Sequence, residues 1–436
     1  MRSADLERLV RGGAWKDRVA HALAARDEAM PDGEPEIAYV RFKPDVGCLL
    51  GVQSPGGPLG YLKLFTDADA AAECAAKYGP REANGGWVEL LADGTTAFFR
   101  FPLDRNVRGL RFVTDMDRLK HLLHAGTKEF APDGLRVRGS RSRAELLKYK
   151  PERRCIARAE LAVRDERTGE RGRRRVVAQA NGDDTGAEVL RVLRHLHDRP
   201  GSGALRSPRP LGYDTANRVL LLEWVEGEEL GDVLGDPRAE VACSVAGMAL
   251  RELHSLPFPS GPPVRRAESV RERVLRILFD LARTGGGDLA SRAKDLEGRL
   301  PRALDDAGEA EPRILHGDFY FHQIILGPDG CRVIDWDETA LGDPRTDVAN
   351  FLAHLHLREI QGVLDAERAG RLRDSFLDGH RDGGPAPAGL DVLIAAQLTL
   401  LCLSPFRNLE PDWREQCAAI LDRAQELLGA GTGARR

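Results

Sequence analysis

An order of three predicted strands and one predicted helix occurs twice in the first half of the chain. Each predicted strand is a short run rich in β-branched and aromatic residues, bounded by turns that contain proline and glycine. The first set covers residues 37–42, 48–52, 60–65 and 67–77. The second set covers residues 146–149, 155–162, 174–180 and 185–197. Such an order indicates a repeated unit built from strands and a helix.

Individual residues repeat together with the pattern. Phe42-Lys43-Pro44 and Cys48-Leu49 match Tyr149-Lys150-Pro151 and Cys155-Ile156 at a constant offset of 107 residues. With the same internal spacing, Lys63 and Asp67 align with Gln179 and Asp183, and residues 96–101 align with 219–225. We interpret the match as an internal duplication of about a hundred residues. Chance similarity of two segments is the alternative interpretation.

From about residue 238 onward the pattern is helical. Apolar residues recur at helical spacing in the segments 241–256, 269–283, 289–304, 344–364, 390–403 and 412–428. Glycine and proline predict a loop at 383–389. Residues 314–337 are the one non-helical interruption, and the residues that can carry chemistry gather there.

Composition and charge exclude several classes of protein. The 436 residues, of which 42% are hydrophobic, suffice for two domains with their own cores. With 64 Lys and Arg against 68 Asp and Glu, bulk charge favours neither a nucleic acid nor an anionic membrane as partner. Seven scattered cysteines without a Cys-x-x-Cys pair argue against a disulfide framework and structural zinc. A charged N-terminus and the lack of about 18 uninterrupted apolar residues predict a soluble, cytoplasmic protein.

Residues 314–337 form the motif that carries the chemistry. Two short apolar strands are predicted to flank a turn with Asp318, and the next strand ends at Asp335. We expect these two carboxylates and the amide of Gln323 to converge on one face. Phosphoryl transfer needs one carboxylate that orients the attacking hydroxyl and accepts its proton, and hard oxygen ligands for the Mg²⁺ that bridges the nucleotide phosphates. Further along, Asp343 is suited to cap a helix that starts with Pro344.

At these residues the chain resembles the aminoglycoside phosphotransferase and choline kinase-like superfamily, over residues 140–430. The matching residues are His316-Gly317-Asp318, Gln323, Ile334-Asp335-Trp336-Asp337 and Gly342-Asp343-Pro344-x-x-Asp347-Val348-Ala349. The superfamily usually has Asn at the position of Gln323, but maltokinase-like members also have Gln there. The resemblance implies an α+β, protein-kinase-like bilobal fold, here with a duplicated N-terminal lobe and a helical C-lobe.

The resemblance also implies roles for single residues and two cofactors, ATP and Mg²⁺. Asp318 is expected to be the catalytic base, and His316 of the same motif is grouped with it as catalytic. The implied metal ligands are Asp335, Gln323 and, as an auxiliary, Asp337. Asp347 resembles the structural carboxylate that holds the catalytic loop.

The nucleotide-binding part departs from the superfamily. Gln179 stands in the slot where kinase-like enzymes carry a lysine that contacts the α- and β-phosphates, although Glu188 could still be its partner on the helix. The turn with Lys150, Arg153 and Arg154 lies where the nucleotide loop belongs. Its three cations could neutralise phosphates, or the turn could simply be solvated. By resemblance, main-chain groups near Glu223 and Val225 would bind the adenine edge, and His254 is expected to be a packed histidine.

These observations predict four segments. They are a duplicated lobe used as a cap (1–135), a kinase-like N-lobe (136–235), a helical catalytic C-lobe (236–430) and a disordered tail (431–436). The first copy does hold a lysine in the slot, Lys63, with Glu73 ten residues on, but no catalytic loop follows it. We therefore expect this copy to serve as a cap, a surface for homodimer formation or a substrate platform rather than as a second nucleotide site.

The expected activity is phosphorylation of a hydroxyl group by ATP and Mg²⁺. An antibiotic, a sugar or a similar metabolite is the expected acceptor, and a Ser/Thr-containing precursor peptide is an alternative, because the helices expected to form the acceptor wall carry mixed charge. A pseudokinase-like module that binds nucleotide or peptide without turnover is the other alternative. Gln179 and Gln323 favour that module, whereas the presence of both Asp318 and Asp335 favours the enzyme.

Overall fold

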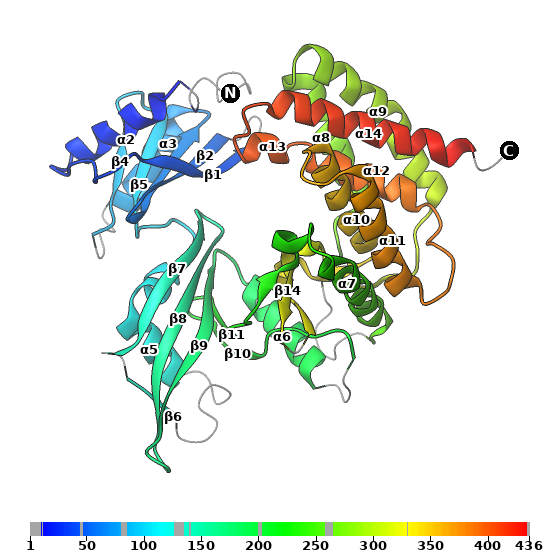
Figure 1. The fold of residues 1–436 in the computed structure, drawn as a ribbon. Helices are drawn as coiled ribbons and strands as arrows, with labels where there is room; N and C mark the ends of the chain where they lie inside the picture. The colour runs from blue at the N-terminus through cyan, green and yellow to red at the C-terminus, as the bar shows by residue number, and fades with distance from the viewer. Residues whose placement is uncertain are drawn as a thin grey trace. The chain divides into compact units, whose positions relative to one another are not determined.

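A computed structural model describes residues 10, 12–43, 47–79, 85–125, 135–138, 141–198, 203–257, 265–328 and 330–433. The chain divides into two compact units, the first formed by residues 1–190 and 210–224 and the second by residues 191–209 and 225–436. The first unit holds most of the strands and the second holds most of the helices (Figure 1). Both the predicted cap (1–135) and most of the predicted N-lobe (136–235) belong to the first unit.

The first antiparallel sheet of the first unit has the strand order β1-β2-β3-β5-β4. Its elements are β1 (Glu36–Lys43), β2 (Gly47–Ser54), β3 (Gly57–Phe65), α3 (Ala68–Tyr78), β4 (Val88–Leu90) and β5 (Thr96–Arg100), preceded by α2 (Ala14–Ala24). The Asp67 carboxylate caps α3 by accepting a hydrogen bond from the Ala70 amide (2.7 Å). The stacked rings of Tyr61 and Phe99, with centroids 4.6 Å apart, lie in the core on the α3 side.

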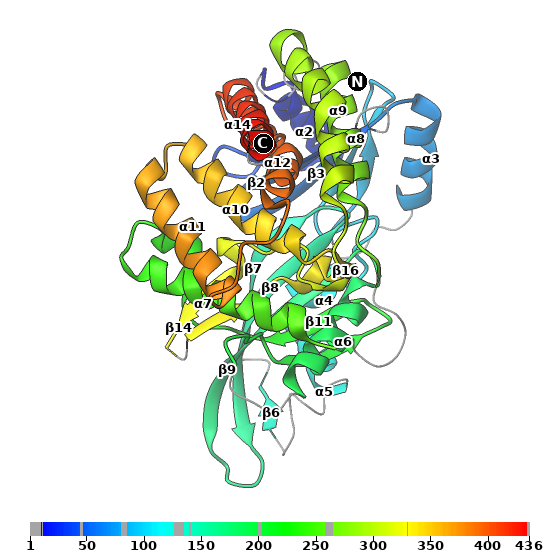
Figure 2. The same ribbon diagram turned by 90° about the vertical axis from the view of Figure 1, so that its right-hand side faces the viewer.

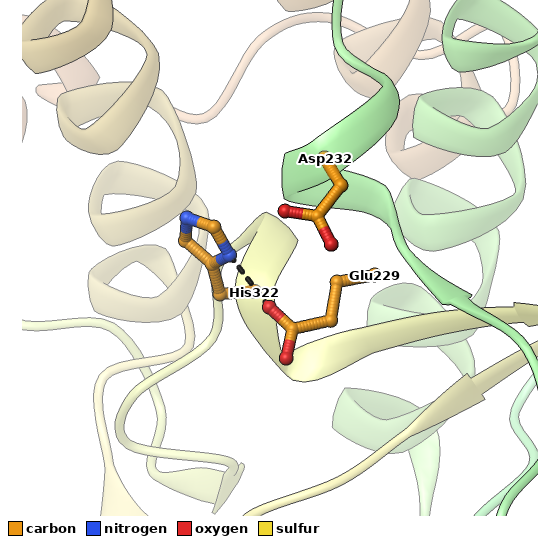
Figure 3. Close-up of side chains that lie close together, drawn as sticks. All are labelled: Glu229, Asp232 and His322. Carbon is orange, nitrogen blue, oxygen red and sulfur yellow. Dashed lines mark hydrogen bonds and ion pairs between the residues drawn. The ribbon is translucent and has the colours of Figure 1, made fainter. Parts of the chain in front are cut away.

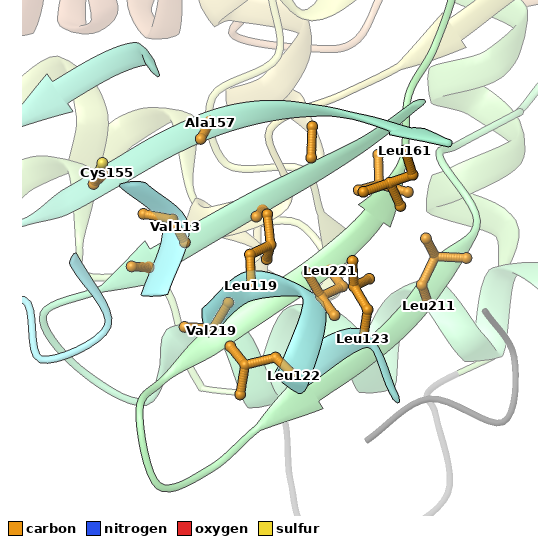
Figure 4. Packing of buried hydrophobic residues seen from close by; sticks show 14 of the residues in the cluster. Val113, Leu119, Leu122, Leu123, Cys155, Ala157, Leu161, Leu211, Val219 and Leu221 are labelled. Atoms are coloured by element: carbon orange, nitrogen blue, oxygen red, sulfur yellow. The ribbon is translucent and has the colours of Figure 1, made fainter. Parts of the chain in front are cut away.

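The second sheet of the first unit has the strand order β10-β11-β9-β8-β6, and β7 also pairs with β8. Its elements are β6 (Leu135–Val137), β7 (Arg143–Lys150), β8 (Arg154–Asp165), β9 (Arg171–Asn181), β10 (Pro210–Asp214) and β11 (Val219–Glu223), with α6 (Thr185–His197) after β9. Every second residue of β8 is buried, as the period of a strand requires. The buried face packs against α4 (Leu110–Thr114) and α5 (Met116–Ala125), as Figure 4 shows for Leu119, Leu123 and Leu161.

The strand pairing of the two sheets agrees with the duplication that the sequence predicts. The first sheet runs β1-β2-β3-β5-β4, and the strands of the second copy pair in the corresponding order β7-β8-β9-β11-β10. In each copy a helix, α3 or α6, follows the third strand along the chain. In the first sheet Lys63 pairs with Leu49, and in the second Gln179 pairs with Ile156, which is Leu49 shifted by 107 residues. Gln179 therefore occupies the lysine slot of the repeat. Pro44 of the repeated Lys-Pro pair lies outside the described residues.

The second unit is built from helices around two short sheets. The helices are α7 (Arg238–Ser255), α8 (Val270–Thr284), α9 (Gly287–Ala307), α10 (Arg345–Ile360), α11 (Ala366–Arg381), α12 (Leu390–Leu401), α13 (Ser404–Arg407) and α14 (Trp413–Gly433). The strands are β12 (Glu228–Glu229) with β14 (Ile324–Gly327) and β15 (Gly330–Val333), and β13 (Arg313–Leu315) with β16 (Ala340–Gly342). Helix α11 lies beside α7, and α12 packs against α10 and α14 (Figure 2).

Two predictions for the second unit need correction. The predicted helix 344–364 ends at Ile360, and a separate helix, α11, follows it, which the sequence interpretation did not identify. The tail predicted to be disordered from residue 431 is helical to Gly433, because α14 continues that far, and residues 434–436 lie outside the described residues. Within the part of the chain that the structure describes, one segment, Leu390–Arg407, has the length and apolar composition of a membrane span, but 56% of it is buried, as in the core helix of a globular protein.

Candidate active site

The segment that carries the motif lies in the second unit. It forms two short antiparallel strand pairs, β13 with β16 and β14 with β15. A loop, 316–320, follows β13 and leads through the 3₁₀ turn η4 (Phe321–Gln323) into β14. After β15 the chain passes Asp335 and the 3₁₀ turn η5 (Trp336–Glu338) and then pairs back with β13 as β16. The Ile334 amide donates a hydrogen bond to the Gln323 carbonyl oxygen (2.8 Å). The two ends of the motif are thus joined through the main chain.

The carboxylate of Asp347, in the first turn of α10, holds the loop after β13. Its Oδ2 accepts a hydrogen bond from the His316 amide (2.8 Å), and its Oδ1 accepts one from the Gly317 amide (2.9 Å). The side chain of Asp347 is 2% exposed, and Nε2 of His254 also contacts Oδ2 at 3.1 Å. A buried carboxylate that accepts several hydrogen bonds fixes its donors strongly. This geometry confirms the loop-holding role of Asp347 and the packed position of His254.

The imidazole of His316 supports the loop from inside the core. Its Nε2 lies 2.9 Å from the carbonyl oxygen of Ile334, which can only accept, so Nε2 carries the proton. Burial lowers the pKa of His316, and the ring packs edge-on against Trp336 with centroids 4.9 Å apart. The sequence interpretation grouped His316 with the catalytic residues. The structure shows that the ring is fully buried and bonded to the main chain, a position suited to supporting the loop.

Gly317 is required by the close approach of η5 to the loop. Its backbone has φ 83°, in the left-handed region that favours glycine. A Cβ atom at this position would lie 2.1 Å from the carbonyl oxygen of Glu338. The glycine therefore lets the two halves of the motif meet.

Asp318 and Gln323 lie next to each other at the end of this loop. The Gln323 amide Nε2 is 3.5 Å from Oδ2 of Asp318, at the long end of hydrogen bonding. Asp318 is half-buried, whereas Gln323 is buried. Burial raises the pKa of the neighbouring Tyr320, and the negative charges of Asp318 and Asp335 raise it further. Asp318 therefore lies beside Gln323, and both Asp318 and Asp335 are close enough to Tyr320 for their charges to act on its pKa.

Asp335 stands at the start of η5 in a left-handed conformation, with φ 60° and ψ 65°. Such a conformation is uncommon for residues other than glycine and is concentrated at functional sites. The half-buried Asp335 and Asp337 are both close enough to His316 for their charges to act on its pKa. Carboxylate oxygens with an amide oxygen from Gln323 are the hard donors that Mg²⁺ prefers. The donor set therefore fits the implied ion.

The residues predicted to contact nucleotide lie mainly in the first unit. Gln179 is buried on β9, and its Nε2 donates to Oδ1 of Asn181 (3.1 Å). Glu188 is half-buried on α6, and Glu223 ends β11, just before Val225 begins the second unit. The basic turn joins β7 to β8, where the main chain of Lys150 pairs with that of Arg154 and the Arg153 amide donates to the Lys150 carbonyl oxygen (3.0 Å).

The sequence interpretation did not identify two further groups that order the site. Asn350, one helical turn after Asp347, donates from Nδ2 to the Phe319 carbonyl oxygen (3.2 Å) and so gives the loop a second tether. The other group is a cluster beside η4 formed by Glu229, Asp232 and His322 (Figure 3). A helical spacing of three from Asp347 was a usable signal for Asn350, but nothing in the sequence links Glu229 to His322, 93 residues away.

The cluster beside η4 has the residue types of a metal site but is already hydrogen-bonded. Nδ1 of His322 is 2.8 Å from Glu229 Oε2, and Nε2 is 2.7 Å from Nη2 of Arg358. Since a guanidinium can only donate, Nε2 must be the acceptor and Nδ1 must carry the proton. A metal would need a free lone pair on the ring and would have to displace the Arg358 cation. Glu229, His322 and Arg358 are therefore better described as a chain of hydrogen bonds that orients His322, next to Gln323.

Comparison with known proteins agrees with the motif. A family model described as "Phosphotransferase enzyme family" matches residues 163–393, more than half of the chain. No curated protein matches the sequence. Similar solved structures include a choline/ethanolamine kinase family protein from Mesorhizobium loti, with 16% identity, a TM-score of 0.46, and coverage of 72% of this chain and 94% of that chain. A choline kinase from Cryptosporidium parvum has 12% identity, a TM-score of 0.48, and coverage of 73% and 97%. A macrolide 2′-phosphotransferase from Brachybacterium faecium has 18% identity, a TM-score of 0.43, and coverage of 70% and 97%.

Proposed function

Because the chain belongs to the phosphotransferase enzyme family and is an ATP-dependent phosphotransferase, we propose that it phosphorylates a hydroxyl group of an antibiotic, a sugar or a similar metabolite. The observation that carries the proposal is the double hydrogen bond from the loop amides to Asp347, which presents Asp318 beside Gln323. A half-buried carboxylate on a rigid loop can orient a hydroxyl and accept its proton during the transfer.

The other site residues have matching proposed roles. Asp335, Gln323 and Asp337 would hold Mg²⁺, which when bound neutralises charge on the nucleotide phosphates. The residues proposed to bind ATP are Lys150, Arg153, Arg154, Gln179, Glu188, Glu223 and Val225. His316, buried and neutral, keeps the loop that carries Asp318 in place.

Two observations define the competing proposals. Gln179 in the lysine slot removes one cation from the phosphate site, which favours a module that binds nucleotide or peptide without turnover. The mixed charge of α8, α9 and α11 leaves a Ser/Thr-containing precursor peptide as the alternative acceptor. An acceptor panel separates all three possibilities.

Other parts of the proposal concern location and partners. All seven cysteines are described, buried and free, as expected in a reducing, cytoplasmic environment. A net charge of −4 supports a small-molecule or peptide partner rather than a nucleic acid or a membrane. A homodimer through the first lobe belongs to the same proposal.

Thermal-shift titration with ATP, ADP and GTP, with and without Mg²⁺, tests nucleotide binding first. We expect Mg²⁺ to strengthen stabilisation by ATP, and we expect Asp335→Ala to remove that gain. Asp374→Asn, an exposed change on α11, is the matched control and should behave as the wild type. ADP release is then measured across antibiotics, sugars and peptides. Nucleotide affinity that depends neither on Mg²⁺ nor on Asp335 would make the motif structural only.

A further inference from the structure

The turn between β7 and β8 is fastened to the first sheet through a buried glutamate. Glu152, at the tip of this turn, has a side chain that is 2% exposed. Its Oε1 accepts a hydrogen bond from Nζ of Lys63 (2.7 Å), and its Oε2 accepts one from Nη2 of Arg41 (2.6 Å). Nε of Arg105 lies 2.9 Å from Oε1 as a third cation. Arg41 comes from β1, Lys63 from β3, and Arg105 from the segment after β5.

The main chain of the turn is held as well. Asp104 Oδ2 accepts hydrogen bonds from the Glu152 amide (2.9 Å) and from the Tyr149 hydroxyl (2.7 Å). Glu152 has φ 59°, a strained conformation for a residue with a Cβ, which persists only when the surroundings determine it. Pro151 packs against Gly51 of β2, where a Cβ atom would lie 3.2 Å from the proline ring.

This arrangement uses the lysine slot of the first copy. Lys63 occupies the position that Gln179 has in the second copy, and the sequence offered Glu73 on the following helix as its partner. The structure pairs Lys63 with Glu152 instead, and Glu73 is exposed. In the first copy, the group that faces the slot lysine is thus a carboxylate from the second copy.

The charges favour a fixed, ionised Glu152. Burial alone would raise the pKa of Glu152, but hydrogen bonding and charge from Lys63, with the charges of Arg105 and Arg41, outweigh burial, so the pKa lies below its ordinary value. Removing one partner of a buried ion pair leaves an uncompensated charge and is strongly destabilising. The turn is therefore held in one conformation rather than sampling many.

We propose that Glu152 is a positioning residue for nucleotide binding. Arg41, Lys63 and Arg105 of the first copy bind its carboxylate and so fix the turn that carries Lys150, Arg153 and Arg154. The inference rests on the proposed function, in which these three cations face the phosphates. It gives the duplicated lobe a role, because Arg41, Lys63 and Arg105 all belong to that lobe. It also accounts for a phosphate site without the slot lysine, since a rigid turn keeps its cations in place and loses less entropy on binding.

Glu152→Gln tests the anchor, with amide hydrogen exchange and nucleotide affinity as the two measurements. We expect faster exchange at residues 152–154 and about tenfold weaker binding of MgATP, the scale of one charge-assisted contact, with adenosine affinity unchanged. A loss confined to the phosphates would not follow from general destabilisation. Glu160→Gln is the matched control, because Glu160 on β8 also lies near three arginines, Arg143, Arg173 and Arg175. It should leave MgATP affinity unchanged.

Lys63 supplies a second pair of variants, which leave Glu152 itself in place. Lys63→Arg keeps a cation next to Glu152 and should retain MgATP affinity, whereas Lys63→Met should weaken it. Combining Lys63→Met with Glu152→Gln should cost less than the sum of the two single effects, because both remove the same interaction. These variants keep the test open if Glu152→Gln does not fold.

The outcomes distinguish the inference from the proposed function. Wild-type protein that binds no MgATP contradicts the proposed function. Hydrogen exchange alone then tests whether Glu152 fixes the turn. Unchanged exchange in a folded Glu152→Gln protein overturns the anchor. Faster exchange with unchanged MgATP affinity overturns the positioning role.

Discussion

At the scale of single residues, the geometry of the catalytic loop depends most on Asp347. Its buried carboxylate accepts hydrogen bonds from two successive loop amides and also contacts the His254 ring. An asparagine has one oxygen instead of two, so one of these donors would lose its acceptor. The arrangement explains why a buried residue belongs to the motif.

Asp347→Asn should lower kcat strongly while leaving ATP affinity within about twofold, since the loop that carries Asp318 loses one tether. An unsatisfied buried donor costs about 1–3 kcal/mol of stability. Urea denaturation and steady-state kinetics measure the two effects. Asp365→Ala is the control, because it removes the N-cap of α11 at a similar cost in stability but away from the loop, and it should preserve kcat. Equal kcat in Asp347→Asn and wild type would contradict the assigned role.

The ionised Glu152 side chain should make the stability of the folded protein depend on pH in the acidic range. Its pKa in the folded protein lies below the ordinary value of 4.5, so its contribution to stability is present above about pH 4.5 and is lost as the pH falls through the folded-state pKa. The charged groups that face it are Arg41, Lys63, Arg105 and, through the main chain, Asp104. The Tm difference between wild type and Glu152→Gln should therefore be largest near pH 7 and should shrink toward pH 3. A difference that does not change with pH would show that Glu152 is not held as an anion.

The roles of Asp347 and Glu152 could be predicted from the sequence to different degrees. Asp347 could be assigned from its motif, because it lies 31 residues from its loop partner in a recognisable pattern. Glu152 could not, because its partners Arg41 and Lys63 are 111 and 89 residues away, and nothing local distinguishes a buried ion pair from a solvated turn. The basic turn was identified from its lysine and arginines, while the acidic residue between them decides how it is held.

At the scale of elements, the loop after β13 and the 3₁₀ turn η5 must touch for the motif to close. Gly317→Ala should prevent this contact, because its Cβ would overlap the Glu338 carbonyl oxygen and its φ is positive. We expect a loss of about 1–3 kcal/mol and of most activity. Gly370→Ala is the matched control in α11, where a Cβ meets nothing within 4 Å, and it should be neutral or slightly stabilising. Calorimetry and kinetics on both variants check the prediction, and a fully active Gly317→Ala protein would refute the close approach.

The third strand of the second sheet supplies the other prediction at this scale. If the anchored turn provides the phosphate charge, Gln179→Lys should not improve MgATP binding, and a buried, weakly paired ammonium on β9 should lower Tm. Isothermal titration with MgATP and adenosine gives the comparison. A tenfold gain in MgATP affinity would show instead that the phosphates lack a cation, as expected of a binding module.

Most elements followed from the sequence pattern, and the exceptions have physical reasons. The first three strands of each copy, the helix at 185–197 and the helices around the motif were predicted to within a few residues, because strong apolar periodicity marks them. Helix α11 was missed because it is rich in arginine and aspartate, although Gly362 with φ 69° and the Asp365 cap marked its start. Strands as short as β4 and β12 have too few residues for any period.

At the scale of the whole molecule, the chain combines a duplicated sheet with one catalytic segment. The duplication could be predicted because residues and element order repeat together, and the pairing of Lys63 with Leu49 and of Gln179 with Ile156 agrees with it. The sequence could not show that side chains of the first copy form buried ion pairs with Glu152 of the second copy. That contact depends on tertiary packing, which leaves no periodic trace in either copy.

The central claim is that Asp318 carries out phosphoryl transfer rather than merely belonging to a binding fold. The most direct test is ADP release from MgATP in the presence of the acceptor, for wild type and Asp318→Asn, with MgATP affinity measured on both. We predict unchanged affinity and a turnover lower by about 10²- to 10⁴-fold, because an amide cannot accept the hydroxyl proton. Equal turnover in the two proteins would contradict the account.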